Sequence, residues 1–341
     1  MRKLSRLICI TLLLSLTAVS PFNQALADND KLTMMWWNVE NLFDTVDDPL
    51  TRDSEFTPEG KKRWTEKKLL LKCMRISHIV KVVALKTGGY PGILAFAEVE
   101  NLNVFKKLLS FLPDNSYKTA YHASNDPRGI DIALAYDAEK IRLLRTLSYR
   151  VNLRERNTRD ITLYSFTADN CPFFLLVNHW PSRSLDQAWS EPFRLQAAQT
   201  AKTIIDSLRK ISTDADIVVM GDFNDDPGDK SIQEILHATT ERDAFSRKSI
   251  GKLFNFWTKS REKGSCYFRS RWFQFDQVMV SSGLFDDRGL SVPEDAFSCF
   301  HIRHMEKGSN RRPYATYKGQ KYLGGYSDHF PLLFQAEVHK R

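Results

Sequence analysis

Apolar segments of two kinds alternate along the first two thirds of the chain. The runs at 32–38, 92–97 and 217–220 are mostly apolar and rich in β-forming residues, which predicts buried strands. In the segments 63–86 and 192–211, apolar residues recur every three to four positions, the spacing that places them on one face of a helix. The alternation of buried strands with amphipathic helices is typical of an α/β protein.

Further strands follow one another directly in the middle and at the end of the sequence. The patterns predict them at 117–122, 130–136, 141–151, 161–166, 173–177, 274–281 and 331–338, with short helices at 104–112 and 229–237. The segment 240–272 fits neither pattern. Consecutive strands favour antiparallel pairing and strand–helix alternation favours parallel pairing, so the sheets should be mixed. We expect an α/β fold of the four-layer sandwich type, with two packed mixed β-sheets flanked by helices.

Several predicted strands are bordered by polar side chains that could carry chemistry. The clearest case is the 217–220 strand, which stops at Gly221 and is followed by Asp222 and Asn224 in a loop closed by Pro227. Comparable residues border four other strands: Asn38, Glu98, His179 and the pair Asp328–His329. Functional residues are often placed at such positions because a rigid strand holds the adjoining loop in place.

The first 27 residues have the features of a secretory signal peptide. Three basic residues precede an apolar stretch, residues 7–19, that is too short to span a bilayer, and Ala-Leu-Ala at 25–27 fits a cleavage site. An uncleaved anchor is the alternative. No later segment is apolar enough to cross a membrane, so we expect an exported, soluble chain in which residues 28–341 form one domain. A monomer is favoured.

The net charge is mildly basic. Loss of residues 1–27 would remove three basic and no acidic residues, which lowers the formal net charge from +8 to +5. A basic chain suits a polyanionic partner such as nucleic acid. A solvated basic surface explains the same charge, so charge alone does not decide between the two.

Four cysteines follow the predicted signal peptide: Cys73, Cys171, Cys266 and Cys299. Their spacing fits neither a dense disulfide scaffold nor a zinc site. Cys73 lies on the inner face of the predicted 63–86 helix, as a buried thiol would. If one bridge forms, we expect Cys266–Cys299, because both residues lie in the loop-rich C-terminal third.

The polar residues beside the strands combine carboxylates, carboxamides and two histidines. They are Glu98, Asp222, Asp276, Asp328, Asn38, Asn224, His179 and His329. Oxygen ligands with few histidines suit Mg²⁺, with Mn²⁺ or Ca²⁺ as alternatives, better than zinc or copper. A histidine beside an aspartate is suited to proton transfer. A metal ion, a His–Asp pair and amide donors together indicate attack of water on a phosphorus centre.

Seven sequence blocks resemble, in order, the signature blocks of the endonuclease/exonuclease/phosphatase family. They are WNVENLF (37–43), AEVEN (97–101), RGIDIALAY (128–136), NHWPSR (178–183), GDFNDDP (221–227), FDQVMVS (275–281) and SDHFP (327–331). The resemblance covers nearly all of residues 28–341 and is strongest to deoxyribonuclease-like, exported bacterial members. It implies an Mg²⁺-dependent phosphoric ester hydrolase.

The resemblance also implies which residues hold the metal ion. Glu98 matches the main Mg²⁺ ligand of the family, and Asn38 matches its metal-site asparagine. Asp328 matches an aspartate that lies near the metal. Read without the resemblance, Asn38 could equally end its strand in a turn.

The remaining site residues are implied to handle the water and the phosphate group. Asp222 and Asn224 match the pair that positions the attacking water, and His329 matches a histidine that contacts the phosphate. Asp276 matches the aspartate that hydrogen-bonds this histidine. His179 matches a general acid or phosphate-binding residue, with a structural loop histidine as the alternative. Whether Asp222 or the Asp276–His329 pair is the base stays open.

Substrate recognition is the least determined feature. Arg128 and Arg183 could clamp phosphate, or could form surface ion pairs. The segment 252–273 mixes basic and aromatic residues, which suits a nucleic-acid channel or a packed loop. We expect a secreted or periplasmic nuclease that hydrolyses DNA or RNA. The alternatives are a phosphomonoesterase, a sphingomyelinase-like lipid phosphodiesterase and a non-catalytic binding module.

Overall fold

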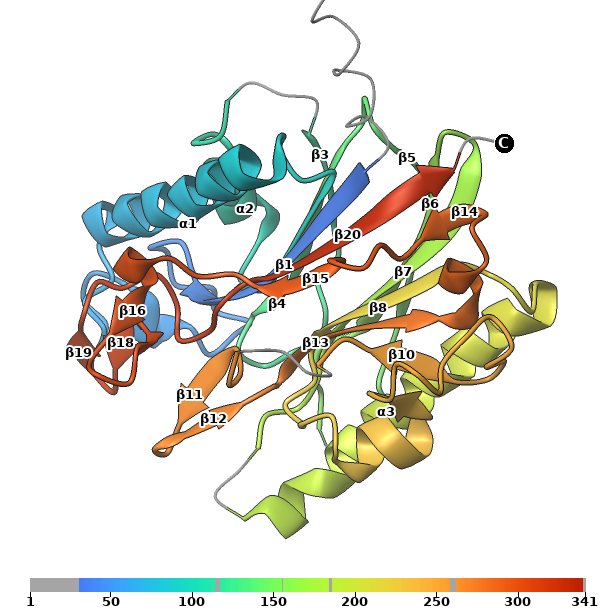
Figure 1. Cartoon of the computed structure of the whole chain (residues 1–341). Coiled ribbons are helices and arrows are strands. Elements are labelled where there is room, and N and C mark those ends of the chain that lie inside the picture. The colour runs from blue at the N-terminus through green and yellow to red at the C-terminus, as the bar shows by residue number, and fades with distance from the viewer. Residues whose placement is uncertain (1–30, 114–116, 155, 184–185, 258–261, 340–341) are drawn as a thin grey trace, which may run out of the picture.

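The computed structural model describes residues 31–113, 117–154, 156–183, 186–257 and 262–339. Two seven-stranded mixed sheets pack face to face, with helices α1 and α2 outside the first sheet and α3 outside the second (Figure 1). The predicted four-layer α/β sandwich is confirmed. The predicted signal peptide, residues 1–27, lies outside the described residues. None of the helices described is long and apolar enough to cross a lipid bilayer.

The first sheet has the order β14-β20-β1-β2-β4-β3, with β15 also paired to β20. Its strands are β1 (Lys31–Leu42), β2 (Ile93–Val99), β3 (Tyr117–Tyr121), β4 (Asp131–Asp137), β14 (Gly289–Ser291), β15 (Phe297–Cys299) and β20 (Leu332–His339). Because β1 and β2 are parallel, their carboxyl ends reach the same edge of the sheet. This edge carries Asn38 and Glu98.

The second sheet has the order β5-β6-β7-β8-β13-β10-β9. Its strands are β5 (Arg142–Tyr149), β6 (Ile161–Ala168), β7 (Cys171–His179), β8 (Ile217–Asp222), β9 (Ala238–Thr239), β10 (Leu253–Asn255) and β13 (Asp276–Ser281). β8 lies between β7, which is parallel to it, and β13, which is antiparallel. The register places Asp222 opposite both His179 and Asp276.

Three α-helices and several single turns complete the outer layers. The helices are α1 (Glu66–Thr87), α2 (Leu102–Leu109) and α3 (Gln187–Ile211), and the turns are η2 (Ser54–Phe56), η3 (Ser231–Ile235), η4 (Ser282–Phe285) and η5 (Arg303–Met305). α3 starts before the predicted residue 192 because the Asp186 carboxylate caps it, accepting a hydrogen bond from the Trp189 amide (3.2 Å). The predicted helix 229–237 is wrong: only the π-helical turn η3 forms there.

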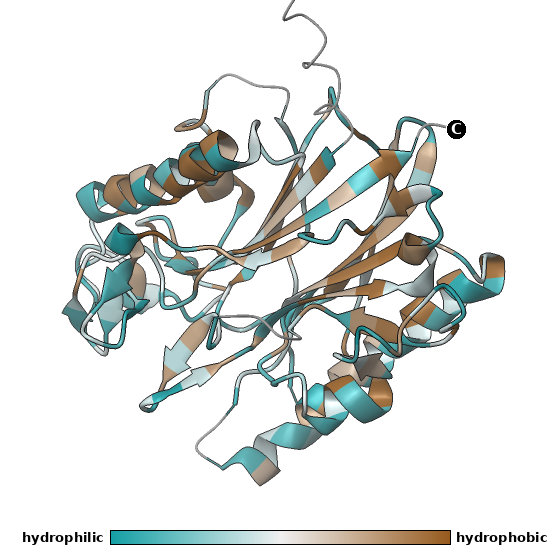
Figure 2. Cartoon of the chain, in the orientation of Figure 1, coloured by the Kyte–Doolittle hydropathy of each residue, from teal (hydrophilic) through white to brown (hydrophobic). Residues whose placement is uncertain are grey.

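Two apolar cores hold the layers together. One lies between the sheets and beneath α1, and the other lies between α3 and the second sheet. Val218 and Met220 of β8 belong to the first core, and Ile217 and Val219 belong to the second. A strand covered on both faces is apolar throughout, which accounts for the unbroken apolar run before Asp222. Figure 2 shows hydrophobic residues along the strands and hydrophilic residues on the outer sides of the helices.

Three short hairpins lie outside the two sheets. They are formed by β11 (Cys266–Phe268) with β12 (Arg271–Phe273), β16 (Glu306–Lys307) with β17 (Arg312–Pro313), and β18 (Tyr317–Lys318) with β19 (Lys321–Tyr322). Strands of two or three residues contain too few positions to show an alternating pattern. This explains why the segment 240–272, which holds β10, β11 and β12, could not be assigned from the sequence.

The four described cysteines are all buried and free. The expected Cys266–Cys299 bridge is therefore wrong. The Cys299 thiol points to the Gly264 carbonyl oxygen (3.8 Å), and Cys266 in β11 is held by a backbone bridge to His329. Both residues serve the packing of the β11–β12 hairpin against the site.

Gly221 is required by the close approach of β7 and β8. A Cβ atom at this position would lie 2.1 Å from the Asn178 carbonyl oxygen, and the Gly221 φ is 154°. We expect Gly221→Ala to lower the free energy of unfolding by about 3 kcal/mol. Gly228→Ala is the matched control, because a Cβ there meets nothing within 4 Å. Urea denaturation of both variants tests this; equal stability would contradict it.

Glu306 anchors the β16–β17 hairpin. Hydrogen bonds from Arg311 (2.7 and 2.8 Å) lower the Glu306 pKa from 4.5 to about 2. Burial opposes this shift, and His301 adds to it. A depressed carboxyl pKa stabilises the fold above the unfolded-state value, and this stabilisation is lost as the pH falls. We therefore expect the stability difference between the wild type and Glu306→Gln to shrink between pH 4.5 and pH 2 in denaturation curves. A difference that does not change with pH would contradict this.

Candidate active site

One edge of the sandwich collects the ends of several strands. The carboxyl ends of four strands lie there, those of β1, β2, β7 and β8, together with the start of β13. Two hydrogen bonds join the sheets there: Asn38 Nδ2 donates to Asp222 Oδ2 (3.1 Å), and Trp36 Nε1 donates to Asp276 Oδ1 (2.7 Å). Trp36 and Asn38 lie two positions apart on β1, so both face the second sheet. The structure thus brings the widely separated predicted residues together.

The Asp276–His329 pair is the most constrained part of the site. Asp276 is fully buried, and its carboxylate accepts hydrogen bonds from Trp36, from Ser265 Oγ (2.5 Å) and from His329 Nδ1 (2.6 Å). Burial would lower the His329 pKa, but the Asp276 charge and Cys266 outweigh it, and the pKa lies well above its usual value. This environment favours the charged form of His329, whose Nδ1 is held by Asp276 and whose Nε2 lies 4.0 Å from Asp328 Oδ1.

Asp222 faces this pair from the end of β8. Its Oδ2 accepts the Asn38 hydrogen bond, and its Oδ1 accepts one from the Asn224 amide (2.9 Å). Burial, followed by the negative charge of Asp276, raises the Asp222 pKa to about 6. Asp222 is thus a buried carboxylate that receives hydrogen bonds from neutral donors.

His179 is buried at the end of β7, and its Nε2 lies 3.8 Å from Asp222 Oδ2. Burial, together with the positive charges of Arg159 and Arg128, places its pKa well below the usual value, so the ring is neutral. Within the part of the chain that the structure describes, His179 Nδ1 is buried and has no hydrogen-bond partner. An unpaired buried nitrogen beside the other site residues is available to a bound substrate.

Asn224 lies in the loop after β8 with a left-handed backbone (φ 51°). Its Nδ2 donates to the Trp180 carbonyl oxygen (3.0 Å), which fixes the loop against the chain that follows His179. The backbone amide of Asn224 also donates to Asp222, so Asn224 holds Asp222 in position.

Glu98 lies at an irregularity of β2, where the strand register shifts and its φ is 63°. Such bulges redirect a side chain beside an active site. Glu98 Oε2 accepts a hydrogen bond from the Asn41 amide (2.8 Å), and Oε1 lies 3.8 Å from Arg128 Nη2. Arg128 also donates to Asn41 Oδ1 (2.7 Å), so it borders the candidate metal ligands.

Asn38 lies between the other two predicted metal ligands. Its backbone pairs with Ala97, next to Glu98, and its carbonyl oxygen accepts a hydrogen bond from Ser327 Oγ (2.6 Å), next to Asp328. The Asp328 side chain is half exposed. Asn38, Glu98 and Asp328 thus offer oxygen donors at one edge, where Asn38 and Glu98 are largely buried and Asp328 is half exposed, and such donors suit a hard divalent cation.

A second set of potential ligands lies deeper. Among the described residues, Asp222, Asp276 and His329 form the one group of three acidic or histidine side chains whose ligand atoms lie within 4.8 Å of one another. This group could hold a metal ion, but it differs from the predicted set. The oxygens of Asp276 and Nδ1 of His329 are engaged by protein partners, but so are Asn38 Oδ1 and Glu98 Oε2 of the outer set. The half-exposed Asp328 carboxylate favours the outer set.

Arg183 forms ion pairs, which were the alternative to a contact with phosphate. Its guanidinium donates to the Asn224 carbonyl oxygen (2.8 Å), to Asp225 (3.1 Å) and to Asp229. Three aspartates, counting Asp226 at 3.7 Å, surround this single cation. Arg183 therefore fastens the loop after β8, and the structure gives no support to its predicted contact with phosphate.

The sequence interpretation missed two residues that support the site, Trp36 and Ser265, which hold Asp276. Arg159, a weaker candidate for contacting phosphate, donates to the Trp180 carbonyl oxygen (2.6 Å) behind His179. The spacing of Trp36 and Asn38 on one strand face was the only available signal. Ser265 lies in the segment that showed no pattern.

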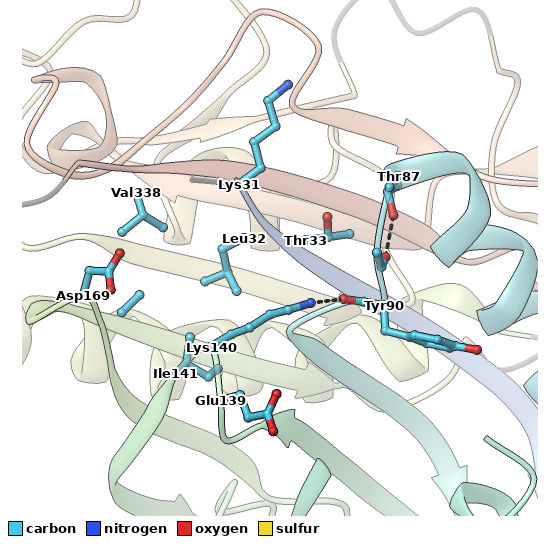
Figure 3. A pocket seen from close by; sticks show the side chains of 13 residues that line it. Lys31, Leu32, Thr33, Thr87, Tyr90, Glu139, Lys140, Ile141, Asp169 and Val338 are labelled. Atoms are coloured by element: carbon cyan, nitrogen blue, oxygen red, sulfur yellow. Dashed lines mark hydrogen bonds between the residues drawn. The ribbon is translucent and has the colours of Figure 1, made fainter. Parts of the chain in front are cut away.

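A pocket of about 680 Å³ lies at the opposite end of the sandwich, where Lys31 begins β1 (Figure 3). Lys140 closes one side by donating to the Tyr90 carbonyl oxygen (2.6 Å). None of the predicted site residues lines it, so it is not the candidate active site. A pocket of about 670 Å³ lined by Arg128 and Arg159 borders the site itself.

The model of one protein family, described as the endonuclease/exonuclease/phosphatase family, matches residues 33–338. The chain belongs to the endonuclease/exonuclease/phosphatase family. Membership supports a phosphoesterase, because the activities in the family's description act on phosphoric esters. No curated protein matches the sequence.

Solved structures share the fold of this endonuclease/exonuclease/phosphatase chain at low identity. D. rerio TDP2 complexed with a single-strand DNA product has a TM-score of 0.55 and 14% identity, over 90% of this chain and 99% of that chain. The human Nocturnin catalytic domain with bound sulfate has a TM-score of 0.52 and 16% identity, over 91% of this chain and 95% of that chain. A mannosyl-6-phosphatase of Bacteroides thetaiotaomicron has a TM-score of 0.55 and 13% identity, over 90% and 99%. These likenesses establish the fold alone.

Proposed function

We propose that this chain is a divalent-metal-dependent phosphodiesterase that hydrolyses nucleic acid, with Mg²⁺ as its metal ion and Mn²⁺ or Ca²⁺ as substitutes. The observation that carries the proposal is the Asp276–His329 pair, locked by Trp36 and Ser265 beside Asp222. A charged imidazole next to a buried carboxylate suits a reaction in which water attacks an anionic phosphorus centre.

Asp222 and His329 take different roles in the proposed reaction. Asp222 receives hydrogen bonds only from the neutral donors Asn38 and Asn224, so it is the group that we assign to accept the proton of the attacking water. His329 has Nδ1 engaged by Asp276, so its Nε2 donates to a phosphate oxygen. This assignment favours Asp222 over the pair as the base.

The other site residues orient the phosphate group. His179 is neutral, and its unpaired Nδ1 is available for a hydrogen bond to the substrate. Asn38, Glu98 and Asp328 would hold the metal ion, which neutralises charge on the phosphate when bound. Arg128, next to Glu98, adds a positive charge at the same edge.

Nucleic acid is the proposed substrate for two reasons. The formal net charge is +8 for the whole chain and +5 without residues 1–27, and a basic chain suits a polyanion. One structure with this fold, D. rerio TDP2, is complexed with a single-strand DNA product. A phosphomonoesterase is the second candidate, since the Bacteroides thetaiotaomicron protein of the same fold is a mannosyl-6-phosphatase.

A substrate panel tests the proposed function. We expect the purified chain to cleave plasmid DNA, single-stranded DNA or RNA with Mg²⁺, Mn²⁺ or Ca²⁺, and to lose activity in EDTA. Small phosphate monoesters and sphingomyelin vesicles are the competing substrates. The proposal fails if all three polymers stay intact with every metal ion. Phosphate release from monoesters alone would favour the phosphomonoesterase.

We further propose that the protein is exported to the periplasm or beyond. The basis is the basic start, short apolar stretch and cleavage site within residues 1–27. Cell fractionation and N-terminal sequencing of the mature protein test this. We expect a chain that begins at Asp28; an intact Met1 on a cytoplasmic protein would contradict it.

A further inference from the structure

An arginine-lined pocket borders the candidate active site on the His179 side. Its volume is about 670 Å³, and its walls come from the loop before β4, the loop between β5 and β6, the chain after β7 and the start of α3. Five arginines and one aspartate line it: Arg52, Arg128, Arg156, Arg159, Arg183 and Asp126. Such an excess of positive charge in a concave surface suits an anion.

The five arginines differ in whether protein carboxylates already hold them, and so in how freely they can bind an anion. Arg183 is held by its three aspartates, and Arg159 pairs with Asp126 (2.9 Å). Arg52 and Arg156 are exposed, and no ion pair to either is found among the described residues. Arg128 lies 3.8 Å from Glu98, so Arg52 and Arg156 are the two cations of the pocket that have no carboxylate partner among the described residues.

Two buried donors on the pocket wall lack partners. Within the described ranges, Arg159 Nε and Thr158 Oγ1 are buried without a hydrogen bond, although both residues are only 6% exposed. Unpaired buried polar atoms are unfavourable and uncommon in folded proteins. Asp126 and the Trp180 carbonyl oxygen hold the Arg159 guanidinium in a fixed direction. A bound phosphate group would supply the missing acceptor oxygens.

The outer wall of the pocket presents a flat aromatic surface. Trp189 is 51% exposed, and the Arg156 guanidinium lies 4.6 Å from its ring centroid. Phe193 packs against Trp189 edge to face, with the centroids 5.1 Å apart. An exposed indole supported in this way is suited to stacking on an unpaired base.

The pocket is continuous with the site. The Trp180 carbonyl oxygen accepts hydrogen bonds from Arg159 in the pocket and from Asn224 in the loop beside Asp222. Arg128 lines the pocket and also lies 3.8 Å from Glu98. A strand bound at Asp222 and His329 can therefore extend into the pocket.

We propose that this pocket binds the phosphate group adjacent to the scissile one in a single-stranded nucleic acid, with the neighbouring base stacked on Trp189. The proposal rests on the proposed phosphodiesterase function and adds what the enzyme recognises beyond the cleaved bond. Single strands fit because a stacked base must be unpaired.

The first test compares a dinucleoside monophosphate with the same molecule extended by one terminal phosphate, on the 5′ side or on the 3′ side. We expect kcat/KM of the wild type to rise about tenfold or more with the extra phosphate on one side, as one charge-assisted contact provides. In the double variant Arg52→Ala/Arg156→Ala, this ratio should fall towards one. Trp189→Ala should reduce activity on longer strands.

Arg142→Ala/Arg145→Ala is the matched control. Both arginines are exposed on β5, whose start lies at the end of the sheet opposite to His179. This double variant removes the same charge and should keep the wild-type ratio. The inference would be overturned if the extra phosphate left kcat/KM of the wild type unchanged, or if both double variants lost the effect of the extra phosphate equally.

A binding measurement separates this inference from the proposed function. Fluorescence anisotropy of a labelled single-stranded oligonucleotide in EDTA should show weaker binding and a smaller salt dependence for Arg52→Ala/Arg156→Ala than for the control. If the wild type cleaves phosphodiesters but Arg52→Ala/Arg156→Ala keeps both the wild-type oligonucleotide binding and the wild-type kcat/KM ratio, the pocket proposal fails and the proposed function stands. If no phosphodiester is cleaved, the proposed function fails and anisotropy decides the pocket.

Discussion

Replacing Asp276 by asparagine is expected to lower kcat by about 10³-fold or more, because a carboxamide cannot hold His329 in the same charged state and orientation. The carboxylate accepts three hydrogen bonds, of which the one from His329 Nδ1 is 2.6 Å long. The measurement is single-turnover hydrolysis of an oligonucleotide across pH. The pH profile should also change, since the imidazole loses the charge that raises its pKa.

Ser265→Ala is the control for Asp276→Asn. It removes one donor to the same carboxylate and leaves the contact with His329 in place. We expect less than about a tenfold loss in kcat from one neutral hydrogen bond. Circular dichroism should confirm that both variants fold, because Asp276 is fully buried. Equal losses in the two variants would show that the Asp276–His329 contact has no special role.

Replacing Glu98 by glutamine is expected to reduce metal-dependent hydrolysis at least about 100-fold. The substitution keeps the shape of the side chain and removes the charge that a divalent cation requires at this edge. Isothermal titration with Mn²⁺ provides a readout that does not depend on activity. We expect weaker Mn²⁺ binding together with the loss of cleavage.

Glu100→Gln is the matched control on the same segment. Glu100 accepts a hydrogen bond from the Asp44 amide (2.6 Å), and it lies two residues beyond Glu98. We expect it to change Mn²⁺ affinity and kcat much less than Glu98→Gln. If Glu100→Gln abolishes Mn²⁺ binding while Glu98→Gln does not, the assignment of the metal ligand is wrong.

The sequence predicted the buried strands because they carry runs of apolar residues, as at residues 217–220. It also located the site, because polar residues such as Asn38 and Asp222 stand out after such runs. The structure places these residues at one edge, as parallel neighbours in each sheet require. Their catalytic and metal-binding roles remain predictions.

The features that the sequence could not give depend on contacts between distant segments. Arg183 is held by aspartates that come after β8, and Trp36 reaches Asp276 across the two sheets. The hydropathy of a single residue carries no information about such partners. The start of α3 was missed for a local reason: Pro192 resembles a helix start, whereas Asp186 caps the chain earlier.

The hydrogen bonds Trp36–Asp276 and Asn38–Asp222 cross the interface between the two sheets. Neither half of the sandwich can assemble a working centre alone, so a partly folded chain with one formed sheet would be inert towards polynucleotides. Because β20, near the C-terminal end, completes the first sheet, a chain cut between β4 and β5 should regain cleavage only when its two fragments reassociate, and enzymatic turnover would then report their joining.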